Sequence, residues 1–189
     1  LVFPWGELRG RPVYRFKLWV WCPSDAEEFA AQKLRRKLFP WSPRWVEFTE
    51  GATADYPLIE ETILKASVDY DLKAVAFDPW GAESTAQRLV AAGVKAFKFI
   101  QNTRYYNEPC CAFERAVIDG RIRHNGNPLL RWMAGNATAA MNGDGFIMPS
   151  KKKSRDKIDG LVASVMALGC QLRVPAEDAA SVYESRGFD

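Results

Sequence analysis

The middle of the chain alternates apolar, strand-like segments with a helical pattern, and this alternation narrows the possible folds sharply. Leu72–Phe77 is apolar apart from Lys73, and Val94–Ile100 is a second segment of the same kind. The helical pattern of Ala82–Ala92 lies between them. Strands without a polar face are typical of a sheet covered on both sides, and strands that alternate with helices indicate an α/β protein.

An antiparallel strand pair is expected before this region. Val13–Cys22 mixes apolar, aromatic and basic residues in near alternation, as a strand does, and we expect Leu1–Leu8 to pair with it across the turn at 9–11. The sequence therefore predicts an α/β fold with a mixed sheet flanked by helices on both faces. With 189 residues the chain can bury roughly 70% of the surface it exposes when unfolded, so we expect residues 1–189 to form a single domain.

Five further segments are predicted to be helical. The first opens with a capping-box pattern, Ser24 followed by Glu27, and continues to about Leu38. The others are Tyr56–Ser67, Pro109–Asp119, Pro128–Met141 and the apolar segment Ile158–Leu168. Asn142–Gly145 is interpreted as a tight turn and not as a calcium loop, because the remaining ligand spacing is absent.

The composition excludes several classes of function. One histidine and four cysteines without a CxxC pair leave zinc fingers and zinc hydrolases without ligands, and the cysteines are expected to be reduced. Neither a GxxxxGK[ST] loop nor a GxGxxG turn is present, so we expect no nucleotide site of either kind. No apolar stretch approaches the ~20 residues of a membrane span. The seven tryptophans, Trp132 among them, do not line up on one element and are interpreted as packing residues.

The carboxylates remain as candidates for catalysis. Asp78 ends the first apolar strand and is followed by Pro79, which stops the strand. An acid at this point lies at the carboxyl edge of the sheet, where open α/β folds place their sites. Aspartate is equally typical of a helix N-cap or a turn, so the position alone leaves both roles open.

Asp156 and Asp159 lie three residues apart where the last helix is predicted to begin, so they can project from nearly the same face. Acids at a helix N-terminus also complement the helix dipole without any further role. Aligned carboxylates without histidines favour Mg²⁺ or Mn²⁺. A pair of such ions ~3.5–4 Å apart can activate water and stabilise the leaving oxygen of a phosphodiester.

Cations crowd against these two acids. The net charge of +3, from 26 Lys and Arg against 23 Asp and Glu, is too small to identify a polyanionic partner, so the distribution of charge must decide. Five of the seven residues in Lys151–Lys157 are basic. Such a run is often only a solvated loop. Beside two carboxylates, however, the basic residues Lys151, Lys152, Lys153 and Arg155 would hold phosphates that the acids alone would repel.

Several motifs then follow one another in a fixed order between Tyr70 and Gly169. They are the strand that ends in Phe77-Asp78-Pro79, the pair Phe113-Glu114, the segment Gly120–Pro128, the residues Trp132 and Asn136, the lysines Lys151–Lys153, the segment Asp156–Gly160, and Ala163 with Met166–Leu168. Through these motifs, more than half of the chain resembles the nuclease domain of the terminase large subunit of tailed phages and prophages.

The resemblance implies an RNase H-like fold and an endonuclease that cuts concatemeric viral DNA with two divalent metal ions, Mg²⁺ or Mn²⁺, held by an acidic cluster. By motif position, Asp78 is similar to the second acid of that cluster and Asp159 to the third, with Asp156 as an auxiliary ligand. The family's first acid has no counterpart in this sequence. The chain begins with Leu1 and not with methionine, and Leu1–Pro4 looks like the continuation of the family's first strand. We therefore expect a fragment, with the missing aspartate just before Leu1.

The same resemblance implies further partners. They are double-stranded DNA, the terminase small subunit, the portal, and an ATPase domain of the same polypeptide that precedes the nuclease. It places the protein in the cytoplasm of the bacterial host, away from any membrane. Two alternatives stay open: another RNase H-like nuclease, of the resolvase or transposase type, and a non-catalytic DNA-gripping module, which the basic run supports equally well.

Overall fold

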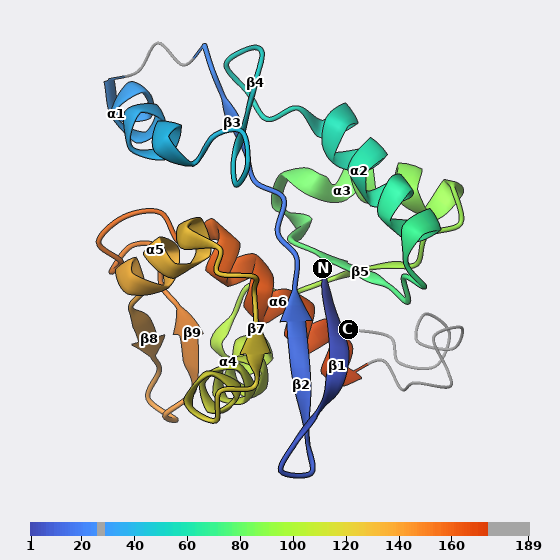
Figure 1. The fold of residues 1–189 in the computed structure, drawn as a ribbon, viewed down its shortest axis with the longest axis vertical. Coiled ribbons are helices and arrows are strands. Elements are labelled where there is room, and N and C mark those ends of the chain that lie inside the picture. Colours follow the sequence, from blue (N-terminus) through green and yellow to red (C-terminus); the bar gives the residue numbers. More distant parts are fainter. Residues whose placement is uncertain (26–28, 174–189) are drawn as a thin grey trace.

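A computed structural model of the chain describes residues 1–25 and 29–173 (Figure 1). Its strands are β1 (Val2–Leu8), β2 (Arg11–Phe16), β3 (Trp21–Pro23), β4 (Glu47–Thr49), β5 (Val75–Phe77), β6 (Ala96–Lys98), β7 (Ile122–Arg123), β8 (Ala139–Met141) and β9 (Ile147–Pro149). Its helices are α1 (Phe29–Leu38), the 3₁₀ turn η1 (Phe39–Trp41), α2 (Tyr56–Asp69), α3 (Pro79–Ala91), α4 (Thr103–Ile118), α5 (Pro128–Asn136) and α6 (Asp159–Arg173). Among the helices described, none combines the length and the apolar character needed to cross a bilayer.

The two strands at the start of the chain form the predicted antiparallel hairpin. Val2 lies opposite Phe16 and Leu8 opposite Arg11, with a shift of register between Pro4 and Glu7. The second strand ends at Phe16, earlier than predicted, and the chain resumes as β3, which pairs in parallel with β4. β7 pairs in parallel with β2, so the three-stranded sheet is mixed.

The predicted alternation in the middle of the chain is also confirmed. β5 and β6 pair in parallel and α3 connects them. Within the described part of the chain, hydrogen bonding divides the strands into one three-stranded sheet and three two-stranded pairs, instead of one continuous sheet. The pieces are short, with three residues in each strand of the β5–β6 pair, so most of their stability comes from the helices packed on them.

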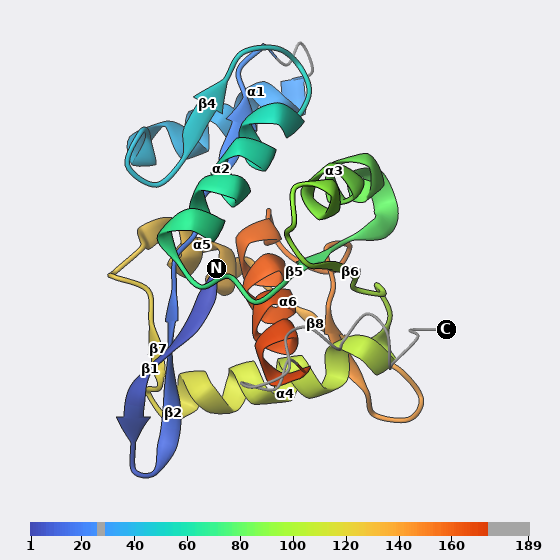
Figure 2. The same ribbon diagram turned by 90° about the vertical axis from the view of Figure 1, so that its right-hand side faces the viewer.

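α4 and α6 cover the β5–β6 pair and the three-stranded sheet alike. Phe97 lies in β6 and Phe99 directly after it. Both pack against Tyr106 of α4 and against Val165 and Met166 of α6. On the other sheet, the side chains of Tyr14 and Phe16 pack against Ala116 and Leu168. Figure 2 shows α6 running through the middle of the molecule, with α4 crossing its lower end.

The helices α4 and α6 approach each other at Gly169. A Cβ atom on this glycine would lie 2.6 Å from Cγ of Pro109 and 3.0 Å from Cε2 of Phe99. These distances are shorter than any normal carbon contact, so only a residue without a side chain fits there. The amino end of α6 has a second such approach, because a Cβ on Gly160 would lie 2.8 Å from the sulfur of Met133.

α4 begins six residues earlier than predicted, at Thr103 instead of Pro109. The side chain of Asn102 caps it by accepting a hydrogen bond from the Tyr105 N–H at 2.9 Å. Pro109 therefore lies inside the helix, where it has no N–H to donate to the carbonyl of Tyr105. The guanidinium of Arg173, at the end of α6, donates to that carbonyl at 3.0 Å. A tertiary contact that the local sequence cannot reveal thus compensates for the proline.

The predicted helix Pro128–Met141 is wrong in its last five residues, 137–141. α5 ends at Asn136, and Ala139–Met141 is the strand β8, which pairs with β9. Glycine and asparagine at 135 and 136 are poor helix formers, and strand pairing offers the following residues a better arrangement. The turn between β8 and β9 is the predicted one, since the Asn142 side-chain oxygen accepts hydrogen bonds from the N–H groups of Asp144 and Phe146.

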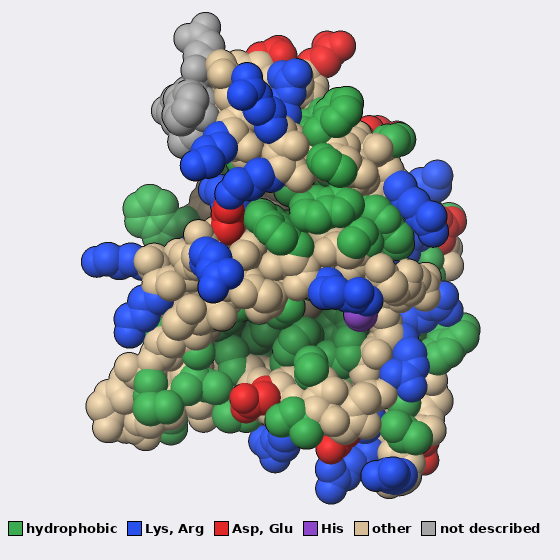
Figure 3. Space-filling view, turned by 60° about the vertical axis from the view of Figure 1, so that its left-hand side comes forward, with side chains coloured by type: hydrophobic (Ala, Val, Ile, Leu, Met, Phe, Trp, Pro, Cys, Tyr) green, Lys and Arg blue, Asp and Glu red, His purple; other side chains and the backbone are tan. Residues whose placement is uncertain are grey.

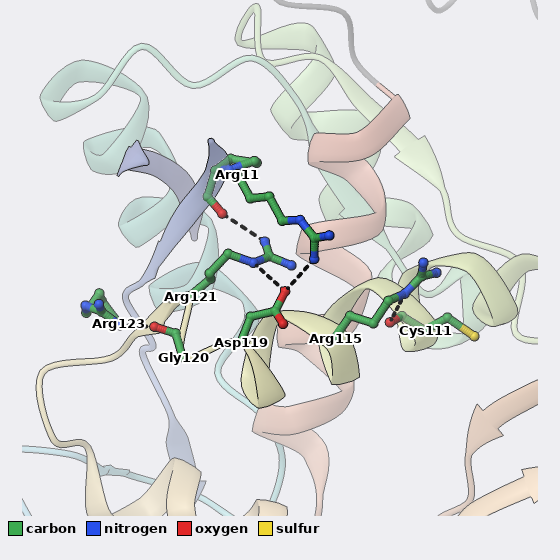
Figure 4. A network of polar contacts seen from close by, with 8 residues as sticks. Arg11, Cys111, Arg115, Asp119, Gly120, Arg121 and Arg123 are labelled. Carbon is green, nitrogen blue, oxygen red and sulfur yellow. Dashed lines mark hydrogen bonds and ion pairs between the residues drawn. The ribbon is translucent and has the colours of Figure 1, made fainter. Parts of the chain in front are cut away.

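A polar network ties the hairpin to the end of α4 (Figure 4). Asp119 accepts hydrogen bonds from Arg121 at 3.0 Å and from Arg11 at 3.1 Å, and the buried Arg121 also donates to the carbonyl of Pro12 at 2.9 Å. The hydrogen bond from Arg121, followed by that from Arg11, holds the pKa of Asp119 below its usual value. Arg121, the second residue of the predicted motif Gly120–Pro128, therefore joins β2 to the residue that ends α4.

The first predicted helix ends at Leu38, as expected. The capping residue proposed for it, Glu27, lies outside the described residues. α2 extends the prediction by two residues and is capped by Asp55, whose side chain accepts a hydrogen bond from the Leu58 N–H at 3.0 Å. α6 extends the last predicted helix as far as Arg173.

Candidate functional site

Asp78 follows the last residue of β5 directly and caps α3. Its Oδ1 atom accepts a hydrogen bond from the Trp80 N–H at 3.0 Å. The sequence left a capping role and a functional role open, and the structure shows the cap. A cap uses one carboxylate oxygen and leaves the other free to bind a ligand, so the structure leaves the functional role of Asp78 as a prediction.

The residues after Asp78 form a bend that turns a tryptophan outward. Trp80 and Gly81 have non-helical backbone angles, and Gly81 has a φ of +87°, which L side chains rarely adopt. As a result the Trp80 side chain is 92% exposed. A second tryptophan, Trp5 on β1, is 56% exposed. The prediction that the tryptophans pack is confirmed for Trp132, whose ring lies 5.5 Å from that of Trp41, but it is wrong for these two.

Asp78 and Asp159 lie at the same end of a packed strand and helix. The Cys170 thiol lies 3.9 Å from the carbonyl of Ala74, the residue before β5. At the other end of β5, the Phe77 carbonyl accepts a hydrogen bond from the Phe99 N–H at 2.8 Å, and the Gln101 amide, two residues further on, contacts the sulfur of Met166, one turn nearer the amino end of α6. β5 therefore runs toward the amino end of α6. Asp78 continues β5 beyond Phe77, and Asp159 is the first residue of α6.

Each of the other two predicted acids has a lysine partner. Asp159 forms an ion pair with Lys151, in which its Oδ1 lies 2.7 Å from the lysine Nζ. Both side chains are more than half exposed. Asp156 is paired with Lys37 of α1 and also accepts a hydrogen bond from the Lys157 N–H at 2.9 Å. The hydrogen bond from Lys37 is the main reason why the pKa of Asp156 lies below its usual value.

The segment Lys151–Lys157, which we call the lysine loop, has a defined backbone. The Ser154 N–H and hydroxyl both donate to the carbonyl of Ser150, at 3.0 and 2.7 Å. The Arg155 N–H donates to the Asn136 carbonyl at 3.1 Å, and the Asn136 amide donates to the Lys157 carbonyl at 3.3 Å. These bonds attach the lysine loop to the end of α5. Its basic side chains, Lys151, Lys152, Lys153, Arg155 and Lys157, are exposed.

Carboxylate oxygens are the donors that Mg²⁺ and Mn²⁺ prefer, so the chemistry of Asp78 and Asp159 suits these ions. Over residues 1–25 and 29–173, however, no three Asp, Glu, His or Cys side chains come together as a metal-binding group. The carboxylates of Asp156 and Asp159 are paired with lysines instead. The described residues alone do not complete the acidic cluster that the resemblance implies.

Three titratable side chains, Tyr106, Cys110 and Cys170, belong to or pack on the hydrophobic cluster beside β6. Tyr106 donates a hydrogen bond to Oε1 of Gln101 at 2.7 Å. Burial is the main cause that raises the pKa of Tyr106, and the charge of Asp78 raises it further. Burial also raises the pKa values of Cys110 and Cys170 to about 12. These groups therefore stay neutral around pH 7 and contribute no charge to the cluster.

Sequence reasoning missed one participant, Lys37. Its contact with Asp156 joins residues 119 positions apart, which no local pattern reveals. A signal was nevertheless present, because Lys33, Arg35, Arg36 and Lys37 make the second dense basic run of the chain.

Comparisons with known proteins identify the family to which this chain is similar. A sequence profile of the family described as "Terminase large subunit, endonuclease domain" matches residues 14–174. "Protein YmfN" of Escherichia coli (strain K12) is 30% identical over 176 residues, covering 89% of this chain and 39% of that protein. The "Terminase, large subunit" of Enterobacteria phage HK97 is 30% identical over 123 residues, covering 64% of this chain and 24% of that protein.

The crystal structure of the HK97 bacteriophage large terminase superposes with a TM-score of 0.75 at 27% identity, covering 87% of this chain and 35% of that one. The chain thus spans less than two fifths of the length of these relatives. The superposition confirms the expected RNase H-like α/β fold. Because the family profile covers most of the sequence, the chain belongs to the family of terminase large subunit endonuclease domains.

Proposed function

We propose that this chain is the nuclease domain of a phage DNA-packaging terminase and hydrolyses phosphodiester bonds of concatemeric duplex DNA in a reaction that needs Mg²⁺ or Mn²⁺. One observation carries the proposal. Asp78 after β5 and Asp159 at the start of α6 lie at the same end of a packed pair, and the lysine loop reaches Asp159 through Lys151. This arrangement supports a site at which acids would hold the metal and cations would bind phosphate.

Asp78 and Asp159 would hold the metal, with Asp156 as the auxiliary ligand. When bound, the ions would supply an activated water and stabilise the leaving oxygen. The chain's own residues prepare the site. The Trp80 N–H fixes one oxygen of Asp78 and leaves the other free, and Lys151 compensates the charge of Asp159. Lys152, Lys153 and Arg155 would bind the phosphates on either side of the scissile bond.

The proposal extends to the surroundings in which the family works. We expect double-stranded DNA as substrate, the terminase small subunit and the portal as partners, and an ATPase domain in the same polypeptide. The reaction would take place in the cytoplasm of the bacterial host. The shares of 24% to 39% that the chain covers of its relatives support further domains for the complete protein.

The test compares Asp78→Asn, Asp159→Asn and the wild type, each made with the upstream strand restored, in plasmid cutting with Mn²⁺ and in Mn²⁺ binding measured by calorimetry. We expect each variant to lose cutting by a factor of 10² or more, roughly the few kcal/mol expected when a group that stabilises the transition state is lost. The control is Asp69→Asn, which replaces an exposed acid on α2. This variant should cut as fast as the wild type. Cutting at the wild-type rate by either site variant would refute the assignment.

The same assays separate the alternatives. Cutting confined to branched DNA would favour a resolvase-type nuclease. DNA binding without Mn²⁺ binding or cutting would favour a DNA-gripping module, a role that the ordered, exposed lysine loop would also suit.

A further inference from the structure

We propose that the exposed side of α1 and the lysine loop form one cationic surface that binds the sugar-phosphate backbone of duplex DNA. This inference rests on the proposed function and extends its DNA contacts to Lys33 and Arg36, residues on another element. The exposed side of α1, called here the α1 cation face, comprises Lys33, Arg36 and Lys37. The α1 cation face and the lysine loop are far apart in the sequence, since residues 38–150 lie between them.

α1 has one apolar and one strongly basic side. Leu38 is buried and Leu34 half-buried, and both pack in a cluster with Leu129 and Met133 of α5 and with Leu161 of α6. The cations point away from this cluster and are exposed, and the ten residues of the helix include no acid. Like charges three and four positions apart cost about 0.2–0.5 kcal/mol per pair in a helix. An anionic partner would remove this cost.

The lysine loop lies beside α1. Lys37 is paired with Asp156 of the loop. Arg35 and Lys157 both act on the same thiol, since each lowers the pKa of Cys22 against the larger effect of burial, which raises it. The hydrophobic cluster described above fixes α1 on α5 and α6, the two helices that flank the β8–β9 hairpin and the loop. Figure 3 shows Lys and Arg side chains gathered over the upper part of this face of the molecule.

The shape and charge of the α1 cation face suit phosphate. A hollow of about 450 Å³ is lined, within the described residues, by Gln32, Lys33, Arg36 and Lys37. No acid within 1–25 or 29–173 forms an ion pair with Lys33 or Arg36, nor with Lys152, Lys153 or Arg155.

Lys37 is the exception, because Asp156 neutralises it while joining the two segments. A helix of this length spans about 15 Å, and duplex DNA carries one charge per ~1.7 Å of its axis, so several phosphates can face the surface at once.

The experiment compares Lys33→Gln/Arg36→Gln with the wild type in binding a labelled duplex of about 30 base pairs, in EDTA and across a series of NaCl concentrations, by fluorescence anisotropy. We expect at least a tenfold loss of affinity at low salt. The slope of log K against log[salt] should fall by about 2, since each lost phosphate contact removes about 0.9. The control is Arg9→Gln/Lys95→Gln, which removes the same charge from exposed positions outside the surface. It should change affinity less than about twofold, because only screened long-range charge is lost.

Unchanged affinity and slope in the α1 variant would overturn the inference, as would a wild-type chain that binds no duplex. Competition by polyglutamate as effective as that by unlabelled DNA would also overturn it, since the surface would then bind any polyanion. Circular dichroism melting checks that both double variants are folded. Because EDTA removes metal, binding is measured independently of cutting. The cutting test with Asp78→Asn and the binding test with Lys33→Gln/Arg36→Gln can therefore succeed or fail independently of each other.

Discussion

Lys37 of α1 and Asp156 of the lysine loop form an ion pair between segments 119 residues apart. The same aspartate was predicted as an auxiliary metal ligand. An acid whose oxygen is occupied by a lysine must give up that partner to bind an ion, so the two roles lead to different outcomes in experiments.

Lys37→Met should lower the free energy of unfolding by up to about 1 kcal/mol at pH 7, because the pair is partly exposed. The hydrogen bond from Lys37 lowers the pKa of Asp156 from 3.8 in the folded state. The stabilisation is therefore complete above pH 3.8 and is lost as the pH falls through the lowered pKa. Urea unfolding at pH 7 and at successively lower pH values below 3.8 should show the difference between variant and wild type shrinking. A difference that grows in acid would contradict this.

Exchanging the two residues separates pairing from metal binding. Lys37→Asp/Asp156→Lys keeps an ion pair and the net charge, so we expect it to recover most of the stability that Lys37→Met loses. If Asp156 acts only through Lys37, the exchanged variant should also bind Mn²⁺ as tightly as the wild type in calorimetry. A tenfold or greater loss of Mn²⁺ affinity would instead identify Asp156 as a ligand.

Lys151→Met should increase the affinity for Mn²⁺ about two- to fivefold, because the lysine competes with the ion for Asp159 at 2.7 Å and the exposed setting limits the effect to about 1 kcal/mol. Lys152→Met is the matched control. It removes the same charge from the next residue, which has no ion-pair partner within the described residues, and should leave the Mn²⁺ affinity within twofold. Equal effects of both substitutions would mean that only the general charge of the loop matters.

Gly169→Ala should destabilise the fold, because the added Cβ meets Pro109 at 2.6 Å and overpacking costs about 1–3 kcal/mol. Gly135→Ala on α5 is a matched control with no atom within 4 Å of the added carbon, and the better helix propensity of alanine should stabilise it by up to about 1 kcal/mol. Thermal unfolding of both variants tests the prediction. A melting temperature for Gly169→Ala at or above that of the wild type would show that the helices can move apart freely.

Trp80→Ala should change the free energy of unfolding by less than about 0.5 kcal/mol, because the side chain is 92% exposed. Trp132→Ala should cost clearly more, about 2 kcal/mol or above, since its ring packs on Trp41 in a hydrophobic cluster. Denaturant unfolding monitored by far-UV circular dichroism compares the two. A large loss of stability in Trp80→Ala would mean that the outward position of this ring does not persist in solution.

The sequence predicted those features that depend on local patterns. The hairpin, the alternation around β5 and β6, and the start of α6 near Asp159 follow from apolar periodicity and turn residues, and the structure confirms them. The position of Asp78 at a strand end was also predicted, with a cap as one of the two roles left open. The order of several motifs, and not any single one, led to the family.

The features that escaped prediction depend on contacts across the chain. From the sequence, Pro109 is predicted to start a helix. It lies inside α4 because Arg173 donates a hydrogen bond to the carbonyl of Tyr105, which the proline leaves without a partner in the helix. Residues 139–141 read as a helix until β9 is known to pair with them. The ion pair of Lys37 with Asp156 and the close approach at Gly169 likewise join segments that are far apart in sequence. Local propensity carries no information about these partners.

The two glycines of α6 have a consequence for how this helix can change. Gly160 faces Met133 and Gly169 faces Pro109, so both clearances must be met at once. A one-residue insertion between them would rotate one end of the helix against the other by about 100° and lengthen it by about 1.5 Å. If Gly160 kept its contact, Gly169 would leave the contact with Pro109. If Gly169 kept its contact, Gly160 would leave Met133 and the neighbouring Asp159 would turn away from its present direction. The number of residues between the two glycines is therefore as tightly constrained as their identity, while the exposed positions Ala163 and Leu172 carry no such packing constraint.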